Sequence, residues 1–556
     1  MADSKADSIH VAIVGSGPSG IAAASVLLEK GFHVDIYDGG ETRDASAEQL
    51  KKELQVQIAR QLEPDTKQWH QLLNGVEGNS FWGLLKDVLN ATFLNRIRPE
   101  AIEKRNLGSR FAFRNTHSGI PLKGLHLPRS MAVAGLSNVW GAASYPLRPD
   151  EYHLWPLDQQ HLSPWYTKAE QLLNLEYSID GLADCYPASD RARKEYEKFT
   201  SGYLEPMLDH WGRYQQQLSE HGVAYGRARI AVNRKTQQED GCRYCGLCLT
   251  GCPVDAIWHA GKGLEKIQTS LLRHLPGNLI HSFTESDNGI SLKRLVDGQV
   301  EMVDTRYDAV VLAAGALSSV RIAAQSRQWQ GKVPILSNEL MVVPFKNRVN
   351  PIGSNHKNFG LSEAVIAMNG EFTGASPAHM QLYRFTLPLL GPVANLLVSL
   401  PGILRRLFTA PFSRLVFGFI YLHSEDSARY SATVDASSEG LSQLNIEMDK
   451  PGRGKKLFSS IMDKLKSMHL VTGIKPVLSL AKSTPAGFSC HIGGTMPMRR
   501  KPGEMETDLS GRLSGTHRCY VVDAAVFPSL PAQNLTLTVM ANAMRIANDI
   551  SKEAIQ

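Results

Sequence analysis

The stretch HVAIVGSGPSGIAAASVLLEKGFHVDIYD, residues 10–38, decides the fold. Residues 10–14 form a short apolar run typical of a buried strand, and residues 15–20 form a glycine-rich turn. The next twelve residues have helical composition and include Gly31 as a stop signal, and residues 33–37 read as a second strand before Asp38. This order of strand, turn, helix, strand and acid predicts a dinucleotide-binding unit.

The residues of the turn have separate physical roles. Gly15 allows a tight turn, Gly17 lets the backbone approach a pyrophosphate, and Gly20 allows the helix to pack closely on the strand. The helix N-terminus, where Ser19 lies, offers free N–H groups to phosphate oxygens. Asp38 lies 18 residues beyond Gly20, near the expected place of a ribose-binding acid. The motif alone leaves FAD and NAD both open.

Length and composition bound the class of protein. The 556 residues predict two or three structural units with a shared core, and the 43% apolar and 21% charged residues are ordinary for a globular protein. The net charge of +6 is modest, and no segment concentrates Lys and Arg as nucleic-acid-binding proteins do. No secretory signal is recognisable in the N-terminal residues, so we expect a cytoplasmic protein that does not bind nucleic acid.

Cysteines are clustered in one part of the chain. Four of the seven lie within eleven residues, namely Cys242, Cys245, Cys248 and Cys252. Their spacing, CxxCxxCxxxCP, is that of the bacterial ferredoxin run, and we therefore predict an iron–sulfur cluster. Zinc is a weaker alternative, because structural zinc usually takes two CxxC pairs from separate loops. Thiols without a metal are the third alternative.

The fourth ligand of such a cluster stays open. In ferredoxins with two clusters, the cysteine before the proline serves the other cluster, but this chain has a single run. Cys252 can therefore complete a [4Fe–4S] cluster, be replaced by a distant cysteine, or remain outside a [3Fe–4S] cluster.

The middle of the chain predicts a cap and a return to the first sheet. Residues 150–240 are polar and mostly helical in pattern, which indicates a peripheral cap. Asp297 and Gly298 predict a hairpin between alternating strands, and a buried strand follows in AVVLAAG, residues 309–315. A return strand of this kind is typical of flavoproteins with two dinucleotide-binding units and favours FAD over NAD.

Residues 372–424 contain no Asp or Glu, and they carry arginines among apolar residues. Prolines interrupt the stretch, so no apolar run reaches the roughly 18 residues that a membrane-spanning helix needs. Two interpretations stay open. The stretch is either a surface that meets anionic lipid, which would give peripheral contact at the inner face of the membrane, or the wall of an apolar substrate pocket.

Several segments resemble one enzyme family. FSCHIGGTMPM (residues 488–498) has a histidine before a Gly-Thr pair, and residues 520–547 run from a strand through Asp523 and Asn534 into a helix of small residues. Together with residues 9–40, 131–143 and 307–320, these segments resemble the glucose-methanol-choline (GMC) oxidoreductases in family order. The family's Asn-Pro pair is Asn534-Leu535 here, which keeps the asparagine.

The resemblance implies roles for particular residues. His491 would be the general base that takes the proton of a substrate hydroxyl, and Asn534 would hydrogen-bond the same oxygen. Candidate contacts to the flavin are, besides the turn and Asp38, Ser137, Asn138 and Trp140 in MAVAGLSNVWGAA (residues 131–143) and Asp523 and Ala524 in the C-terminal block. Val139 stands where some sugar oxidoreductases of the family carry a histidine bonded covalently to the flavin, so we expect a non-covalently bound FAD.

The predicted class is α/β: a discontinuous Rossmann-type FAD-binding domain with an inserted α+β substrate domain and an iron–sulfur segment. Its predicted parts are residues 1–150, 260–330 and 484–556 for the FAD-binding domain, 151–259 for the cap with the cysteines, and 331–483 for the substrate domain.

The predicted function is a dehydrogenase that oxidises a sugar or glycoside hydroxyl and passes electrons through the cluster to an external acceptor. One alternative is a lipid, long-chain or lipid-linked alcohol as the substrate. The other, of a different class, is a non-catalytic electron-transfer module.

Overall fold

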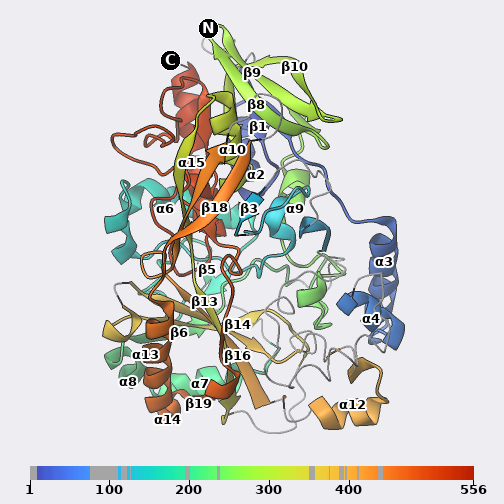
Figure 1. The fold of residues 1–556 in the computed structure, drawn as a ribbon. Coiled ribbons are helices and arrows are strands. Elements are labelled where there is room, and N and C mark those ends of the chain that lie inside the picture. The colour runs from blue at the N-terminus through green and yellow to red at the C-terminus, as the bar shows by residue number, and fades with distance from the viewer. Residues whose placement is uncertain are drawn as a thin grey trace.

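The structure is a computed structural model. It describes residues 9–74, 110–113, 122–125, 127–193, 201–234, 238, 240–349, 357–374, 376–386, 394, 397–409, 412, 414–435 and 442–555. Figure 1 shows an elongated molecule with both ends of the chain at its upper end. No helix in these ranges is long and apolar enough to cross a membrane.

A five-stranded parallel sheet forms the upper half. Its order is β22-β11-β1-β2-β7, and all four pairings are parallel. The strands are β1 (His10–Val14), β2 (His33–Tyr37), β7 (Leu272–Leu275), β11 (Ala309–Leu312) and β22 (Cys519–Val521). Segments from the beginning, middle and end of the chain therefore lie side by side. The predicted strands at 10–14 and 33–37 are present, and the strand predicted in residues 309–315 spans Ala309–Leu312. The sheet agrees with the mixed α/β class.

Helices cover this sheet. They are α2 (Pro18–Glu29), α6 (Gln159–Leu172), α9 (Ala260–Lys266), α10 (Ala316–Ser326) and α15 (Thr536–Ile555). The C-terminal helix α15 packs against both α2 and α6. The first helix ends at Glu29, and Gly31 follows with a φ of 80°, a left-handed conformation that glycine adopts without steric cost.

A three-stranded meander extends the upper end. It consists of β8 (Leu279–Ser286), β9 (Gly289–Val296) and β10 (Gln299–Tyr307). Asp297 and Gly298 join β9 to β10 with φ values of 49° and 83°. Positive φ at both central residues is the mark of a type I′ turn, so the predicted Asp-Gly hairpin is present.

Two sheets of mainly antiparallel strands form the rest of the scaffold. The first, in the order β21-β12-β17-β18-β3, contains β3 (Leu122–Gly124), β12 (Gly331–Ser337), β17 (Arg429–Asp435), β18 (Gln443–Lys450) and β21 (Ile492–Gly493). The second contains β6 (Val223–Arg227), β13 (Leu340–Asn347), β14 (Ser362–Met368), β15 (Ala378–Arg384), β16 (Leu415–Leu422), β19 (Ile474–Pro476) and β20 (Lys482–Ser483). Strand β6 comes from the range predicted as a helical cap, yet it pairs with β14 in this second sheet.

Further elements complete the lower half and the right-hand side of Figure 1. The helices are α3 (Ala45–Ala59), α4 (Thr66–Asn74), α7 (Glu205–Arg213), α8 (Gln215–Glu220), α12 (Gly402–Thr409), α13 (Gly454–Ser467) and α14 (His469–Thr472), and a two-stranded pair joins β4 (Tyr177–Ser178) to β5 (Ala192–Arg193).

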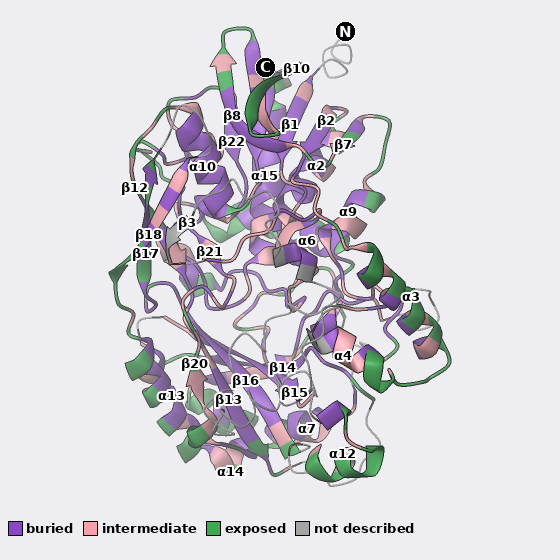
Figure 2. Cartoon of the chain, turned by 45° about the vertical axis from the view of Figure 1, so that its right-hand side comes forward, coloured by how far each residue is buried: buried purple, intermediate pink, exposed green. Residues whose placement is uncertain are grey.

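The molecule has two main apolar cores. One surrounds the parallel sheet, and the other lies between the seven-stranded sheet and helices α7 and α13. Figure 2 shows the central strands as buried, α3 and α12 as largely exposed, and α13 with both buried and exposed residues. The described parts of residues 372–424 include two kinds of structure, because β15 and β16 are buried strands while α12 lies at the surface.

Candidate active site

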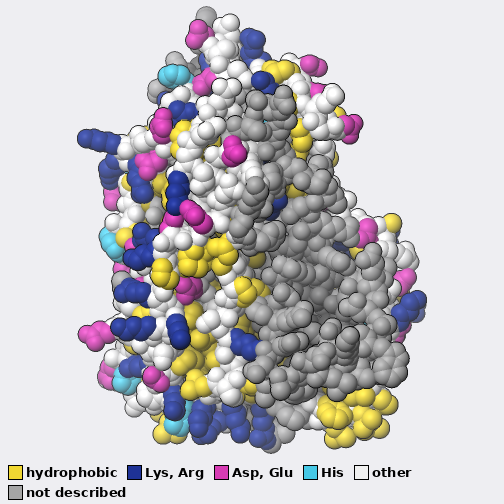
Figure 3. All heavy atoms as spheres, in the orientation of Figure 1, with side chains coloured by type: hydrophobic (Ala, Val, Ile, Leu, Met, Phe, Trp, Pro, Cys, Tyr) yellow, Lys and Arg dark blue, Asp and Glu magenta, His cyan; other side chains and the backbone are white. Residues whose placement is uncertain are grey.

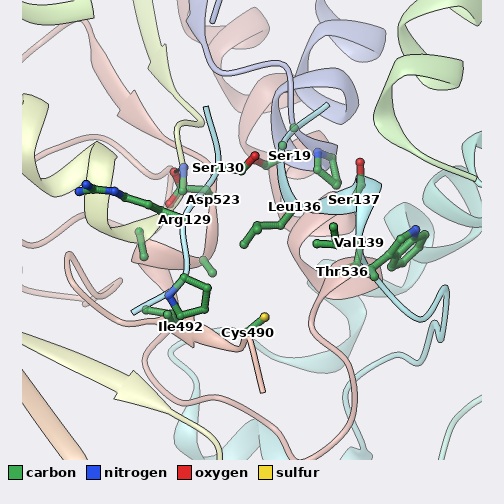
Figure 4. A pocket seen from close by; sticks show the side chains of 18 of the residues that line it. Ser19, Arg129, Ser130, Leu136, Ser137, Val139, Cys490, Ile492, Asp523 and Thr536 are labelled. Atoms are coloured by element: carbon green, nitrogen blue, oxygen red, sulfur yellow. Dashed lines mark hydrogen bonds between the residues drawn. The ribbon is translucent and has the colours of Figure 1, made fainter. Parts of the chain in front are cut away.

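A cavity of about 380 Å³ lies where the parallel strands end. Its wall includes Gly15 after β1, Asp38 after β2, Gly315 after β11 and Asp523 after β22. In open α/β sheets, ligands bind outside the carboxyl ends of the strands. Figure 4 shows Ser19 and Asp523 at one side of this cavity and Cys490 at the other, so the cavity joins the predicted nucleotide motif to the C-terminal block.

The glycine turn presents its backbone to the cavity. Gly15 has a φ of 113°, and a Cβ there would lie 2.4 Å from the carbonyl oxygen of Ala313. A Cβ on Gly20 would lie 1.9 Å from the carbonyl oxygen of Gly15, so Gly20 packs under the turn and does not line the cavity. A Cβ on Gly17 would meet nothing within 4 Å. Gly17 therefore presents bare backbone to open space, as a phosphate-binding turn requires.

The carboxylate of Asp38 is held in place at the cavity wall. The backbone N–H of Gly40 donates to Oδ1 at 2.8 Å, and the imidazole of His274 bonds Oδ2 at 2.7 Å. Each carboxylate oxygen can accept more than one hydrogen bond. Asp38 is thus fixed and retains acceptor capacity for a ligand hydroxyl.

Two arginines that sequence reasoning did not identify line the same end of the cavity. Burial lowers the pKa of Arg321 to about 9, with a further contribution from the nearby positive charge of Arg129. The Nε of Arg321 is buried without a hydrogen-bond partner among the described residues. Two guanidinium groups that repel each other at a buried wall favour an anionic ligand between them.

The loop of residues 131–143 lines another wall, although not with every predicted side chain. Ser137 and Trp140 line the cavity, and so does Val139 between them in space and sequence. Asn138 does not line it, because its amide donates to the carbonyl oxygens of Val133 and Gly135 at 2.8 Å each. Asn138 therefore holds the shape of the loop.

Asp523 links the ends of two strands. Its carboxylate accepts hydrogen bonds from the backbone N–H groups of Gly315 and Ala525 and from the hydroxyl of Ser319. Burial raises its pKa to about 6. Asp523 and Ala524 both line the cavity, and these hydrogen bonds hold the Asp523 carboxylate in place at the wall.

His491 lies at the opposite end, in a fixed tautomer. Its Nδ1 is 3.1 Å from Oδ1 of Asn338. The Asn338 amide nitrogen donates to the carbonyl oxygens of Leu422 (2.6 Å) and Pro531 (3.1 Å), so the oxygen of this amide faces the histidine. His491 Nδ1 must then carry the proton, which leaves Nε2 as a hydrogen-bond acceptor. Burial lowers the pKa of His491 to about 4, so the ring is neutral at pH 7.

Asn534 lies just before α15 and is oriented from β15. Gln381 Nε2 donates to Oδ1 of Asn534, and the Tyr383 hydroxyl donates to Oε1 of Gln381 at 2.7 Å. Because the side-chain oxygen of Asn534 already accepts this hydrogen bond, the group that Asn534 can offer a ligand is its side-chain NH2, a donor. His491 and Asn534 both line the cavity. Together they offer one acceptor and one donor, the pair that a hydroxyl group needs.

Aromatic side chains surround this pair. The ring of Tyr421 stacks on His491 with 5.2 Å between centroids, and Tyr383 packs on Phe419 at 4.7 Å. The three aromatic residues belong to β15 and β16 and line the cavity. The acid-free stretch therefore supplies part of the pocket wall, as one of its two interpretations predicted.

The four clustered cysteines lie beside the cavity. Burial raises the pKa of Cys242 and Cys245 to about 12, and the neighbouring cysteines add to the shift. Backbone N–H groups point at two of the sulfurs, from Tyr244 to Cys242 (3.5 Å) and from Ala256 to Cys252 (3.3 Å).

The cysteine segment contacts the cavity through its neighbours. Leu249, next to Cys248, lines the cavity. Trp140 donates from its indole to the carbonyl oxygen of Trp258 at 2.7 Å. Within the described ranges, no three His, Cys, Asp or Glu side chains are grouped in a way that could hold a metal ion. The iron–sulfur cluster stays a prediction.

A family model described as GMC oxidoreductase matches residues 456–543, a range that contains both His491 and Asn534. This part of the chain is therefore similar to the GMC oxidoreductases. The match indicates an FAD-dependent oxidoreductase that acts on CH–OH groups.

Solved structures include a similar fold. The crystal structure of pyridoxine 4-oxidase from Mesorbium loti is matched with a TM-score of 0.56 and 14% sequence identity, over 97% of this chain and 99% of that chain. At this identity the match establishes the fold alone. No curated protein sequence matches the chain.

The cavity fits the FAD that the GMC family implies. The bare backbone at Gly17 and the unpartnered Nε of Arg321 suit a diphosphate, and Asp38 suits a ribose. Sequence reasoning missed Asn338 and Gln381. Neither residue belongs to a motif, and each acts only because strands distant in sequence bring it against His491 or Asn534.

Proposed function

We propose that this GMC oxidoreductase is a dehydrogenase that oxidises the hydroxyl of a sugar or glycoside. The observation that carries the proposal is the pairing of a neutral His491, whose Nδ1 proton is held by Asn338, with an N–H donor on Asn534. FAD, when bound, supplies the acceptor of the hydride from the CH–OH carbon. Every proton-handling group is supplied by the chain itself.

The chain can bind and deprotonate an alcohol in a simple way. The hydroxyl donates its hydrogen bond to Nε2 of His491 and accepts one from the Asn534 amide, which places the oxygen between the two groups. As the C–H bond weakens, His491 takes the proton and Asn534 stabilises the remaining negative charge on the oxygen. Burial by Tyr421 and Tyr383 keeps water away and strengthens both interactions.

The surroundings of the pair support a substrate with both polar and apolar faces. The Asn534 amide can hydrogen-bond a hydroxyl group, and the aromatic rings offer flat apolar contact. The same apolar wall, with Leu340 and Leu361, supports a lipid, long-chain or lipid-linked alcohol as the second candidate. A module that only relays electrons would need no proton acceptor at this place, so His491 argues against that third function.

We further propose that Cys242, Cys245, Cys248 and Cys252 hold an iron–sulfur cluster that passes electrons to an external acceptor. Support comes from their ferredoxin spacing, from the N–H groups that point at two of the sulfurs, and from Leu249 beside the cavity.

Anaerobic absorbance titration of the purified protein tests the main proposal. Sugars, glycosides and fatty alcohols are added in turn while the flavin band is followed. Bleaching by sugars or glycosides supports the first candidate, and bleaching only by fatty alcohols replaces it with the second. A bound flavin that no alcohol reduces would contradict both.

Iron and acid-labile sulfide analysis tests the cluster separately. We expect both elements in the wild type and a clear loss in Cys248→Ser. Cys185→Ser is the matched control, because Cys185 lies outside the cysteine run, and this variant should keep its iron. Zinc without sulfide in the wild type would refute the cluster while leaving the alcohol site untouched.

A further inference from the structure

Helix α12 exposes an unusual amount of apolar surface. Four large apolar side chains of this eight-residue helix are exposed, namely Ile403 (78%), Leu404 (43%), Leu407 (65%) and Phe408 (58%). We call these four residues the α12 patch. Figure 3 shows a compact apolar area at the lower right corner of the molecule, where Figure 1 places α12. Contiguous exposed apolar surface of this kind marks a binding surface more often than it occurs by chance.

The patch is held in a defined place. Arg405 of α12 forms an ion pair with Glu63 at 3.7 Å, and the hydroxyl of Thr66 in α4 donates to the carbonyl oxygen of Val398 at 3.4 Å. Both views of the chain put α12 at the outermost lower corner. The exposed side chains therefore project from a structured part of the molecule.

The same end of the molecule carries exposed positive charge. Lys346 of β13 is the register partner of Lys475 of β19. Both are exposed, and so are Arg348, which follows β13, and Lys466 of α13. Residues 464–482 and 372–424 contain no Asp or Glu. Among these cations, Leu470 of α14 is 73% exposed. Figures 1 and 2 both place α14 and α12 at the lower end, so apolar points and cations lie at the same end of the molecule.

We propose that this lower end docks on a bilayer that contains anionic lipids. The α12 patch enters the boundary between headgroups and acyl chains, and Lys346, Lys466 and Lys475 meet the negative headgroups. A bilayer surface is layered in the same way, with charge outside and apolar chains beneath it. No described helix is long and apolar enough to cross a membrane. The proposal does not depend on the substrate or on the cluster.

Vesicle flotation of the full flavin-loaded protein tests the docking. The probes are vesicles of phosphatidylcholine alone and of phosphatidylcholine mixed with phosphatidylglycerol. We expect the wild type to float with the mixed vesicles and to bind them less at high salt, because salt screens the cations. Replacing two patch residues, as in Leu407→Ser with Phe408→Ser, should lower the bound fraction about tenfold by removing buried apolar surface.

A matched control separates the patch from general surface apolarity. Val300 and Met302 on β10 are 40% and 52% exposed and lie at the opposite end of the molecule. Val300→Ser with Met302→Ser should float like the wild type. Lys466→Gln with Lys475→Gln should weaken binding to the anionic vesicles and leave flavin content unchanged.

Three results would overturn the proposal. The first is a wild type that fails to float with either vesicle, and the second is patch variants that float as well as the wild type. The third is a patch variant whose only change is its oligomeric state in light scattering, which would make the α12 patch an interface between copies of the chain.

Discussion

The two ends of the cavity are built in different ways. At the cofactor end, one continuous stretch, residues 10–38, supplies a backbone turn and an acid. At the alcohol end, His491 is oriented by Asn338, between β12 and β13, and Asn534 by Gln381 of β15, both far away in sequence. The cofactor end should therefore control how tightly FAD is held, whereas the alcohol end should control how fast substrate reduces it.

The largest effect is expected at the base itself. His491→Ala removes the proton acceptor, so the rate of flavin reduction by substrate should fall about 10²- to 10⁴-fold. Flavin content, measured by absorbance after gel filtration, should stay the same. An unchanged reduction rate would remove His491 from the chemistry and with it the proposed division between the two ends.

A smaller effect is expected at the residue that orients the base. Asn338→Leu removes the acceptor for Nδ1 of His491, so the ring can adopt the wrong tautomer or rotate. By analogy with other residues that orient a functional histidine, the reduction rate should fall about 10- to 100-fold. Stopped-flow absorbance measures it. Asn338→Asp keeps an acceptor and should lose less, which a purely structural role would not predict.

A substitution at the cofactor end should change only the affinity for FAD. Asp38→Ala removes an acceptor from the proposed ribose site, so FAD should dissociate about tenfold more easily, which corresponds to about 1.4 kcal/mol. The flavin that stays bound should be reduced at the wild-type rate. Equilibrium dialysis measures the affinity, and stopped-flow absorbance measures the reduction rate. A slower reduction of the bound flavin would contradict the proposed division between the two ends.

The pH dependence should be the smallest effect near neutrality. Burial lowers the pKa of His491 from its ordinary value to about 4, so the base is already neutral at pH 7. The reduction rate at low substrate should stay nearly flat from about pH 6 to pH 8 and fall as the pH drops towards 4, because a protonated ring cannot accept a proton. A rise in rate with a midpoint near the ordinary histidine pKa of about 6.5 would show that the ring is not buried as described.

The parts of the fold and site that were predictable are those encoded locally. The strand at residues 10–14, the turn around Gly17 and the Asp297-Gly298 hairpin follow from short-range sterics, and each has a distinctive sequence pattern. His491 and Asn534 were identified through the family resemblance, since a single histidine or asparagine has no pattern of its own.

The rest depends on contacts between distant segments. Nothing in the sequence around Asn338 indicates that its amide bonds Pro531 and His491, and Arg321 reads as an ordinary residue of an amphipathic helix. The same limit explains Asn138, where a polar side chain in the predicted flavin loop turned inward to the backbone of its own loop. Strand β6 was also not predicted, because the segment becomes a strand only by pairing with β14.

The central claim is that this cavity oxidises an alcohol at its CH–OH carbon. The most direct test compares anaerobic flavin reduction by the active alcohol with reduction by the same alcohol carrying deuterium on that carbon, both at saturating concentration. If hydrogen leaves that carbon in the reaction, the deuterated alcohol should reduce the flavin more slowly in ordinary water. Reduction by a compound that has no CH–OH hydrogen, at the rate of the best alcohol, would contradict the claim.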